Sequence, residues 1–107
     1  MLSIKKINTP SQGTIRLFLR KVFDDGVKRK LNNGMITAIG LIQGPLAEII
    51  VAGDVAEKTS NVDIAEVAGN CPQHITIIGV FGDTSSVSEA LRAIEAWEKQ
   101  SKPWEAN

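Results

Sequence analysis

Two segments of this chain are apolar almost without interruption, residues 35–43 and residues 75–81. A strand with one face in water alternates apolar and polar side chains, whereas a strand covered on both faces is apolar throughout. We therefore predict that these two segments are strands of a sheet and that both of their faces are covered.

Three further strands are predicted from weaker signals. Residues 2–7 alternate approximately before a turn-rich segment, and residues 62–68 form a short strand-like run. Residues 14–23 alternate more regularly, with apolar side chains on one face and mainly arginines on the other. The first face of that alternation consists of Ile15, Leu17 and Leu19, and the second consists of Arg16, Phe18 and Arg20.

Three helices are predicted between the strands. Residues 24–33 begin with Asp-Asp-Gly and are followed by Asn33-Gly34, which suits a short helix. A second helix is expected through residue 59, with Pro45 at the first helical position, where its missing N–H costs nothing. A third begins at Ser86-Val87-Ser88-Glu89, which has the spacing of a capping box. The apolar stripe of the third helix is Val87, Ala90, Leu91, Ile94 and Trp97. That of the second is Leu46, Ile49, Ile50 and Val55, and the small residues Ala52, Gly53 and Ala56 beside it would let this helix lie close to a sheet or to a neighbouring chain.

These elements indicate one small domain. At 107 residues, the chain has the size of a single domain with one core. The predicted order is strand, strand, helix, strand, helix, strand, strand, helix. An antiparallel-rich sheet with two long helices on one face is typical of an α+β domain of ferredoxin-like character.

The charge balance and the hydropathy pattern exclude two classes of partner. Lys and Arg total 12 and Asp and Glu total 12, so the formal net charge is zero, whereas nucleic-acid binders usually carry a basic excess. No apolar run approaches the roughly 20 residues that span a bilayer, and the first six residues lack the apolar core of a secretion signal. We therefore expect a cytosolic protein with no nucleic-acid or membrane partner.

The only cysteine and the only histidine of the chain lie three residues apart between two predicted strands. One thiol per chain cannot form a closed metal site, which normally takes four protein ligands. A catalytic pair is disfavoured because no third group orients the histidine. Two interpretations stay open: an inert thiol in a turn, or thiols from several copies of the chain that meet at one site. The segment reads Gly69-Asn70-Cys71-Pro72-Gln73-His74.

Residues 35–93 resemble the shell domain of bacterial microcompartments. Members of that family show a similar Ala-Ile-Gly strand, a helix with Lys and then Asn-Val near its end, and a Gly-Asp entry from a strand into a helix. The three segments occur here in the same order and at matching spacing. They are Ala38-Ile39-Gly40-Leu41-Ile42, Ala52-Gly53-Asp54-Val55-Ala56-Glu57-Lys58-Thr59-Ser60-Asn61-Val62, and the run from Ile78 to Leu91.

The order of elements resembles a circularly permuted member of that family. The usual shell domain begins near the Ala-Ile-Gly strand and ends with its last strand. Here the strand predicted at Thr14–Phe23 and the short helix after it precede Met35, and little follows Trp97. The permuted shell proteins of ethanolamine and propanediol microcompartments are similar. The resemblance implies an N-terminal extension at residues 1–13, a permuted shell domain at residues 14–99 and a polar tail at residues 100–107. Residues 1–7 are a candidate for a small barrel over the axis.

By this resemblance the protein is not an enzyme but a hexameric shell tile, whose partners are other copies and other shell proteins. The pore loop of the family corresponds to Gly69–His74, so six copies of Cys71 would surround one axis. This resembles the glycyl-radical propanediol subset, whose pore loop binds an iron–sulfur cluster. The resemblance implies a 4Fe–4S cluster that some copies of Cys71 ligate and that His74 supports by hydrogen bonding. Lys58 matches a lysine that the family places at the hexamer edge.

Two other functions are compatible with the sequence. The same hexamer could lack a cluster and conduct small metabolites through a pore that Cys71 lines. Alternatively, the chain is a dimeric or trimeric regulatory domain that binds a small molecule on a ferredoxin-like fold. The native mass separates the last function from the first two.

Overall fold

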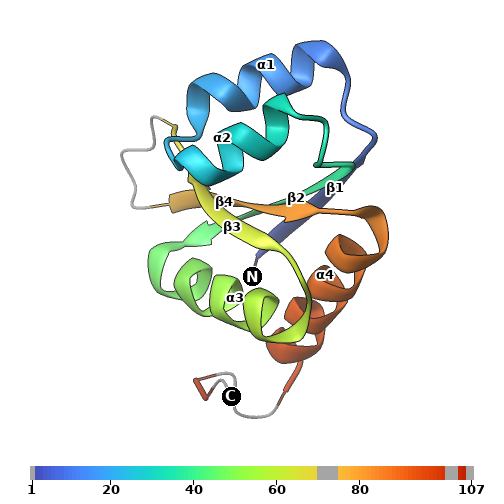
Figure 1. Ribbon diagram of the computed structural model, residues 1–107. Coiled ribbons are helices and arrows are strands. Elements are labelled where there is room, and N and C mark those ends of the chain that lie inside the picture. The colour runs from blue at the N-terminus through green and yellow to red at the C-terminus, as the bar shows by residue number, and fades with distance from the viewer. Residues whose placement is uncertain (1, 70–74, 101–103, 106–107) are drawn as a thin grey trace.

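The computed structural model describes residues 2–69, 75–100 and 104–105, and within them the chain forms four strands and four helices. The elements are β1 (Ser3–Asn8), α1 (Gln12–Lys21), α2 (Asp25–Asn32), β2 (Ala38–Pro45), α3 (Leu46–Thr59), β3 (Asp63–Val67), β4 (Ile75–Gly82) and α4 (Thr84–Glu98). They form three layers, with α1 and α2 on one face of the sheet and α3 and α4 on the other (Figure 1). The predicted α+β class is confirmed, and the two long helices share one face as predicted.

The four described strands lie in the order β1-β2-β4-β3, and every neighbouring pair is antiparallel. β2 and β4 occupy the central positions, and they are the two segments with nearly uninterrupted apolar sequence. Successive side chains of β2 belong to opposite cores: Ala38 and Ile42 pack in the core under α3 and α4, and Ile39 packs in the core under α1 and α2. In β4, likewise, Val80 packs in the first of these cores and Phe81 in the second, so the prediction that both strands are covered on both faces is confirmed. The first predicted strand begins later than expected, because residues 35–37 precede β2 and Met35 is 61% exposed.

Each face of the sheet has its own hydrophobic core. Under α3 and α4, the stripe predicted for the last helix is confirmed, because all five of its residues are buried. Under α1 and α2, Phe81 is fully buried, and its ring meets that of Phe18 edge-on with 5.9 Å between centroids. The second core consists of Phe18, Val22, Val27, Leu31, Ile36, Ile39, Ala65, Val67 and Phe81.

The strand predicted at residues 14–23 is wrong, because residues 12–21 form helix α1. Ser11 caps this helix, since its Oγ accepts a hydrogen bond from the backbone N–H three residues on. Four apolar residues recur at helical spacing and face the sheet, whereas Leu17 is 42% exposed. A segment this short fits the two-residue period of a strand as well as the period of a helix. The N-cap and the contacts with the sheet favour the helix. The residues of the helical stripe are Ile15, Phe18, Leu19 and Val22.

β1 is an edge strand of the same sheet. It pairs with β2 along its whole length, from Ser3 opposite Gln43 to Asn8 opposite Ala38. The predicted domain boundary after residue 13 therefore falls beyond a strand that belongs to the sheet. Residues 3–7, considered above for a separate barrel, lie in this edge strand instead.

Two helices begin differently from the prediction. Pro45 is the N-cap residue of α3 rather than its first helical residue. The N-cap of α4 is Asp83, whose carboxylate accepts a 2.8 Å hydrogen bond from the Ser86 N–H and further bonds from the hydroxyls of Ser85 and Ser86. Ser86 is thus a helical residue and not the start of a capping box. The bond from the Ser86 backbone and those from the two hydroxyls stabilise the charged carboxylate, so they hold the pKa of Asp83 below its ordinary value.

The stripe predicted for helix α3 is confirmed in part: Ile49 is buried and Val55 packs against the core, whereas the other two members are exposed. Leu46 is 52% exposed and Ile50 is 64% exposed, although both belong to the predicted stripe. The buried side of the helix carries small residues, which let it lie close to the sheet; a Cβ added at Gly53 would stand 3.3 Å from Cγ2 of Ile64. Of the three large side chains in the predicted stripe, Ile49 is buried and Leu46 and Ile50 are left on the surface. The buried residues are Ile49, Ala52, Gly53 and Ala56.

Candidate functional site

The segment predicted as a pore loop, residues 69–74, joins β3 to β4 at one end of the sheet. Gly69 is its one residue within the described part of the chain. It is exposed, and a Cβ at that position would meet no heavy atom within 4 Å apart from its chain neighbours. The predicted cluster ligand Cys71 and its neighbour His74 lie outside the described residues, as do Asn70, Pro72 and Gln73.

Both ends of this pore loop are fixed to neighbouring elements. On the β3 side, the Ala68 N–H donates a 2.7 Å hydrogen bond to the carbonyl of Lys21, the last residue of α1. On the β4 side, Ile75 pairs with Pro45, which ends β2 and caps α3. The end of α1 and the start of α3 therefore flank the pore loop on opposite faces of the sheet.

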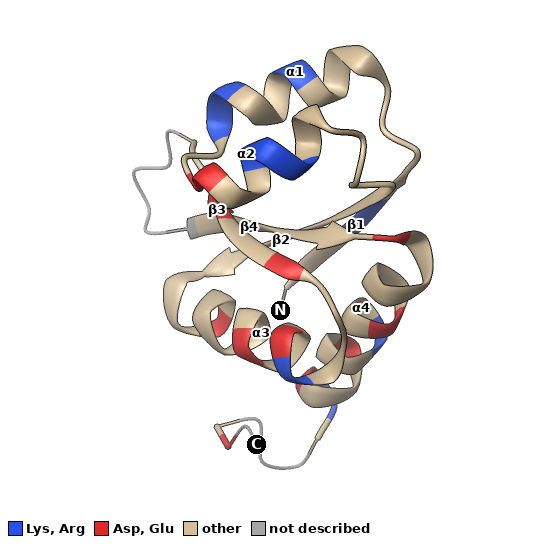
Figure 2. Ribbon diagram, viewed as in Figure 1, with Lys and Arg blue, Asp and Glu red and all other residues tan. Residues whose placement is uncertain are grey.

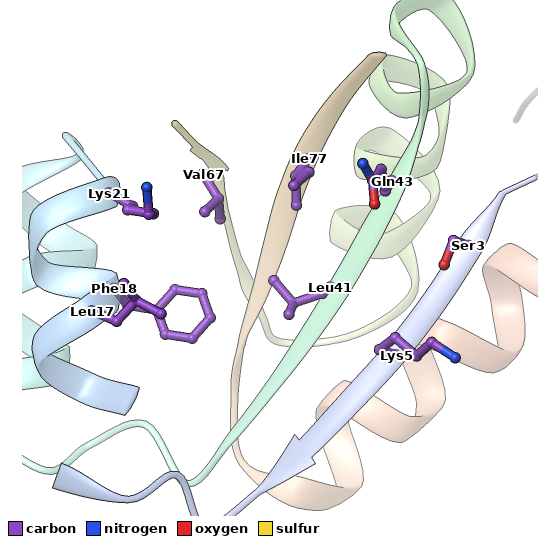
Figure 3. A pocket seen from close by; sticks show the side chains of 9 residues that line it. All are labelled: Ser3, Lys5, Leu17, Phe18, Lys21, Leu41, Gln43, Val67 and Ile77. Atoms are coloured by element: carbon purple, nitrogen blue, oxygen red, sulfur yellow. The ribbon is translucent and has the colours of Figure 1, made fainter. Parts of the chain in front are cut away.

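A cavity of about 210 Å³ lies beside this end of the sheet, between α1 and the strands (Figure 3). Its walls are mainly apolar, with Phe18 on the α1 side and residues from β2, β3 and β4 on the other. Two lysines belong to its lining, Lys21 from α1 and Lys5 from β1. We call this surface the basic pocket. Its apolar residues are Leu17, Phe18, Leu41, Val67 and Ile77.

A second hollow, of about 330 Å³, lies on the opposite face of the sheet between α3 and the β3 edge. The exposed side chains of Leu46 and Ile50 belong to its lining. Three carboxylates accompany them, and one of these, Glu66, accepts a 3.3 Å hydrogen bond from the hydroxyl of Thr76. We call this surface the acidic groove. Its carboxylates are Asp54, Glu57 and Glu66.

The two helical layers carry opposite charge, although the chain as a whole is neutral (Figure 2). Helices α1 and α2 contain six basic residues and one acidic residue, whereas α3 and α4 contain six acidic residues and two basic ones. The prediction from net charge alone missed this separation, which a charge balance for each predicted helix would have found. The basic residues of the first layer are Arg16, Arg20, Lys21, Lys28, Arg29 and Lys30.

Lys58, predicted at a hexamer edge, lies in the last turn of α3, far along the helix from the pore loop. Its ammonium forms a 2.8 Å ion pair with Asp54 one helical turn earlier, and both side chains are about half exposed. Such a pair contributes little to stability. The ammonium is at the surface, and its role at an edge between tiles stays a prediction.

Within the described residues, no group of three or more His, Cys, Asp and Glu side chains is placed to hold a metal ion. The predicted metal ligand, Cys71, lies outside that part of the chain. No described helix combines the length and the apolar character needed to cross a membrane.

Comparison with known proteins identifies one family. The BMC domain model matches residues 38–102, from the start of β2 to beyond α4. No protein with a curated description matches the sequence.

Two solved structures resemble nearly the whole chain. The ligand-free GrpU microcompartment shell protein from Pectobacterium wasabiae is 30% identical, with a TM-score of 0.66 over 87% of this chain and 99% of that protein. The ligand-free GrpU shell protein from Clostridiales bacterium 1_7_47FAA is also 30% identical, with a TM-score of 0.65 over 92% of this chain and 98% of that protein.

A more distant structure shares the fold alone. The trimeric bacterial microcompartment shell protein PduB is 22% identical, with a TM-score of 0.53 over 89% of this chain, which spans 38% of that protein.

Proposed function

The chain belongs to the BMC domain family, and we propose that it forms a hexameric shell tile whose pore loop binds an iron–sulfur cluster. The coarser part of this function is established by the family and by its relatives: the protein is a structural component of a microcompartment shell rather than an enzyme. The hexamer, the cluster and the residues that hold it are the proposal.

The likeness to the two GrpU shell proteins is the observation that carries the proposal. It extends over 87% and 92% of this chain, so it reaches beyond the residues that the family model matches. The family match and the likeness to the two GrpU shell proteins support the shell function over the alternative of a small-molecule-binding regulatory domain.

The position of β1 supports a circular permutation. The match to the family model begins at β2, yet the sheet has an edge strand beside β2 that comes from residues 3–8. In the usual order described above, the last strand of the domain comes from its C-terminal end. We propose that β1 corresponds to this last strand, so that the same fold is formed by a chain that begins and ends at different points.

The donor chemistry of the pore loop suits an iron–sulfur cluster. Thiolates are the usual protein ligands of such clusters, and Cys71 supplies one thiol per chain. In a closed ring every copy of the loop recurs around one axis, so a hexamer brings six equivalent thiols together. A cubane has four irons, so we expect some copies of Cys71 to stay unbound. When bound, the cluster supplies one-electron transfer across the tile or closes the pore.

His74 and Pro72 have supporting roles in this proposal. The residue before a proline favours an extended backbone, so Pro72 is proposed to limit the directions in which the Cys71 thiol can point. His74 is expected to hydrogen-bond near the cluster rather than to ligate iron, as residues around metal ligands commonly do. At the outer edge of the tile, Lys58 is proposed to contact the neighbouring hexamer.

Anaerobic purification followed by an absorbance spectrum and an iron assay tests the cluster. The wild-type protein is expected to be brown, with broad absorbance near about 400 nm from thiolate-bound iron. Cys71→Ser is expected to abolish both the colour and the bound iron, and His74→Ala, a matched change in the same loop, is expected to retain them at lower yield.

Two outcomes would change the assignment. Colour that survives Cys71→Ser unchanged would contradict the ligand role of Cys71. Colourless wild-type hexamers would contradict cluster binding and leave the second function described above, a hexamer with a metabolite-conducting pore.

A further inference from the structure

We infer that the basic pocket of each copy receives the acidic groove of the next copy, so that the two opposite edges of the sheet meet around the ring. This inference rests on the proposed hexamer and deepens it by naming the surfaces that meet. A closed ring with head-to-tail contacts requires two different, complementary surfaces on every copy. The structure offers one such pair.

The position of the pore loop decides which sides of the molecule face its neighbours. The loop joins β3 and β4 at the end of the sheet where β2 ends and α3 begins. When that end points to the axis, the strands run outward, and the two edges β1 and β3 face the neighbouring copies on either side. The basic pocket extends across the sheet under α1, from β1, where Lys5 lies, to the last residues of β3, where Lys21 lies, so it reaches the β1 edge on one face of the sheet. The acidic groove lies at the β3 edge on the other face.

Both surfaces expose apolar side chains close to the proposed axis. In the acidic groove, Leu46 and Ile50 lie one helical turn apart on α3 and are more than half exposed. In the basic pocket, Leu17 is 42% exposed beside an apolar cavity. Helix α3 therefore has one apolar side against the sheet and a second without a partner in the described chain, and a helix with apolar residues on two sides is normally covered on both.

The charges of the two surfaces are complementary. Lys5 and Lys21 belong to the pocket, and neither forms an ion pair within the described residues. Glu57 and Glu66 belong to the groove, and they also form no ion pair within that part of the chain. Two basic pockets would repel each other, and so would two acidic grooves, whereas a pocket and a groove attract. These charges therefore favour head-to-tail contact between copies.

Charge reversal in two separate chains tests this inference by native mass spectrometry. The pocket variant carries Lys5→Glu and Lys21→Glu, and the groove variant carries Glu57→Lys and Glu66→Lys. Each variant alone places like charges at every contact, so we expect monomers in place of hexamers. Mixed in equal amounts, the two variants restore opposite charges at every contact of an alternating ring. We then expect hexamers that contain equal numbers of the two chains.

A matched control separates local contacts from overall charge. Lys28→Glu with Arg29→Glu makes the same change in net charge within the same helical layer, at α2 and away from the basic pocket. This variant is expected to remain hexameric. Circular dichroism and thermal unfolding of every variant show whether a monomer is folded, and an unfolded single variant is replaced by Leu17→Asp or Ile50→Lys, which test the same two surfaces.

The outcomes distinguish this inference from the proposal on which it rests. Wild-type chains that are not hexameric would contradict the hexamer itself. Hexameric wild type with hexameric pocket and groove variants would overturn only the assignment of the two surfaces. Folded monomers that fail to form mixed hexamers would also overturn it, because reversed charges on both sides should restore the contact.

Discussion

The two helical layers share one sheet but differ in charge, in packing and in their relation to the family. The layer of α3 and α4 falls within the residues that the BMC domain model matches and is acidic. Its helices approach the sheet through small residues of α3 and the apolar stripe of α4. The layer of α1 and α2 precedes the match, is basic, and leaves a cavity between α1 and the sheet.

This difference indicates how one fold can present two surfaces of opposite charge to its neighbours in a shell tile. The matched layer supplies the exposed apolar side of α3, and the unmatched layer supplies the basic pocket that we propose to receive it. The layers also flank the two ends of the pore loop. A change in either layer should therefore affect one side of the sheet more than the other, and three pairs of variants test that separation.

The largest expected effect comes from removing the main buried side chain of each core. Phe81→Ala removes the ring that packs against Phe18 under α1 and α2, and Ile94→Ala removes a fully buried side chain of α4. We expect the free energy of unfolding to fall by about 3–5 kcal/mol for the first variant and about 2–5 kcal/mol for the second. Urea denaturation measures these losses.

Hydrogen exchange then tells the two layers apart. Phe81→Ala should lower the protection of amides in α1 and α2 more than in α3 and α4, and Ile94→Ala should show the opposite pattern. Equal loss of protection in both layers after either substitution would show that the layers are not separable and would contradict the comparison.

A smaller effect is expected from filling the space above two glycines on opposite faces of the sheet. A Cβ at Gly79 would collide with the buried ring of Phe81, and a Cβ at Gly40 would stand 2.9 Å from a terminal methyl carbon of Leu91. We expect Gly79→Ala to lower the free energy of unfolding by about 1–3 kcal/mol, because a buried ring has little room to move. Gly40→Ala should cost less, since the end of a leucine side chain moves more easily.

Thermal unfolding measures the stability lost in each of these two variants and so compares how tightly the two cores are packed. A Gly40→Ala variant less stable than Gly79→Ala would mean that the core under α4 is the more tightly packed one.

The smallest effect is a pH dependence of the helix cap of α4. The hydrogen bonds from Ser86 and Ser85 lower the pKa of Asp83, so the ionised cap contributes stability at pH values above its ordinary pKa of 3.8. That contribution is lost as the pH falls through the lower pKa of the folded state. Asp83→Asn should therefore be less stable than wild type near neutral pH, and the difference should shrink in acid.

The cap of α2 offers the matched control. Asp24 accepts a 2.9 Å hydrogen bond from the Val27 N–H in the other layer, and Asp24→Asn keeps a capping side chain there. Unfolding midpoints measured from neutral to acid pH compare both variants with wild type. A stability difference for Asp83→Asn that stays constant over this range would contradict the ionised cap.

The elements with one unambiguous pattern could be predicted from the sequence. The uninterrupted apolar runs gave the two central strands, and five apolar residues at helical spacing gave the buried stripe of α4. Helix α1 could not be predicted from alternation, because residues 14–23 fit a period of two as well as a helical one, and contacts of Phe18 with the sheet decide between them.

The candidate site was predictable only in part. The sequence names the thiol and the loop that carries it, and the structure positions the two ends of that loop. The basic pocket and the acidic groove could not be read from the sequence, because Lys5 and Lys21, like Leu46 and Glu66, come from separate elements that only the fold brings together.

Native mass spectrometry of the anaerobically purified wild-type protein tests the central claim most directly, because one spectrum reports both the number of chains and the bound iron. We predict an assembly of six chains that carries one iron–sulfur cluster, and an assembly of six Cys71→Ser chains that carries none. A dimer or trimer, or a hexamer whose bound iron is unaffected by Cys71→Ser, would contradict the claim that copies of Cys71 around one axis form the site.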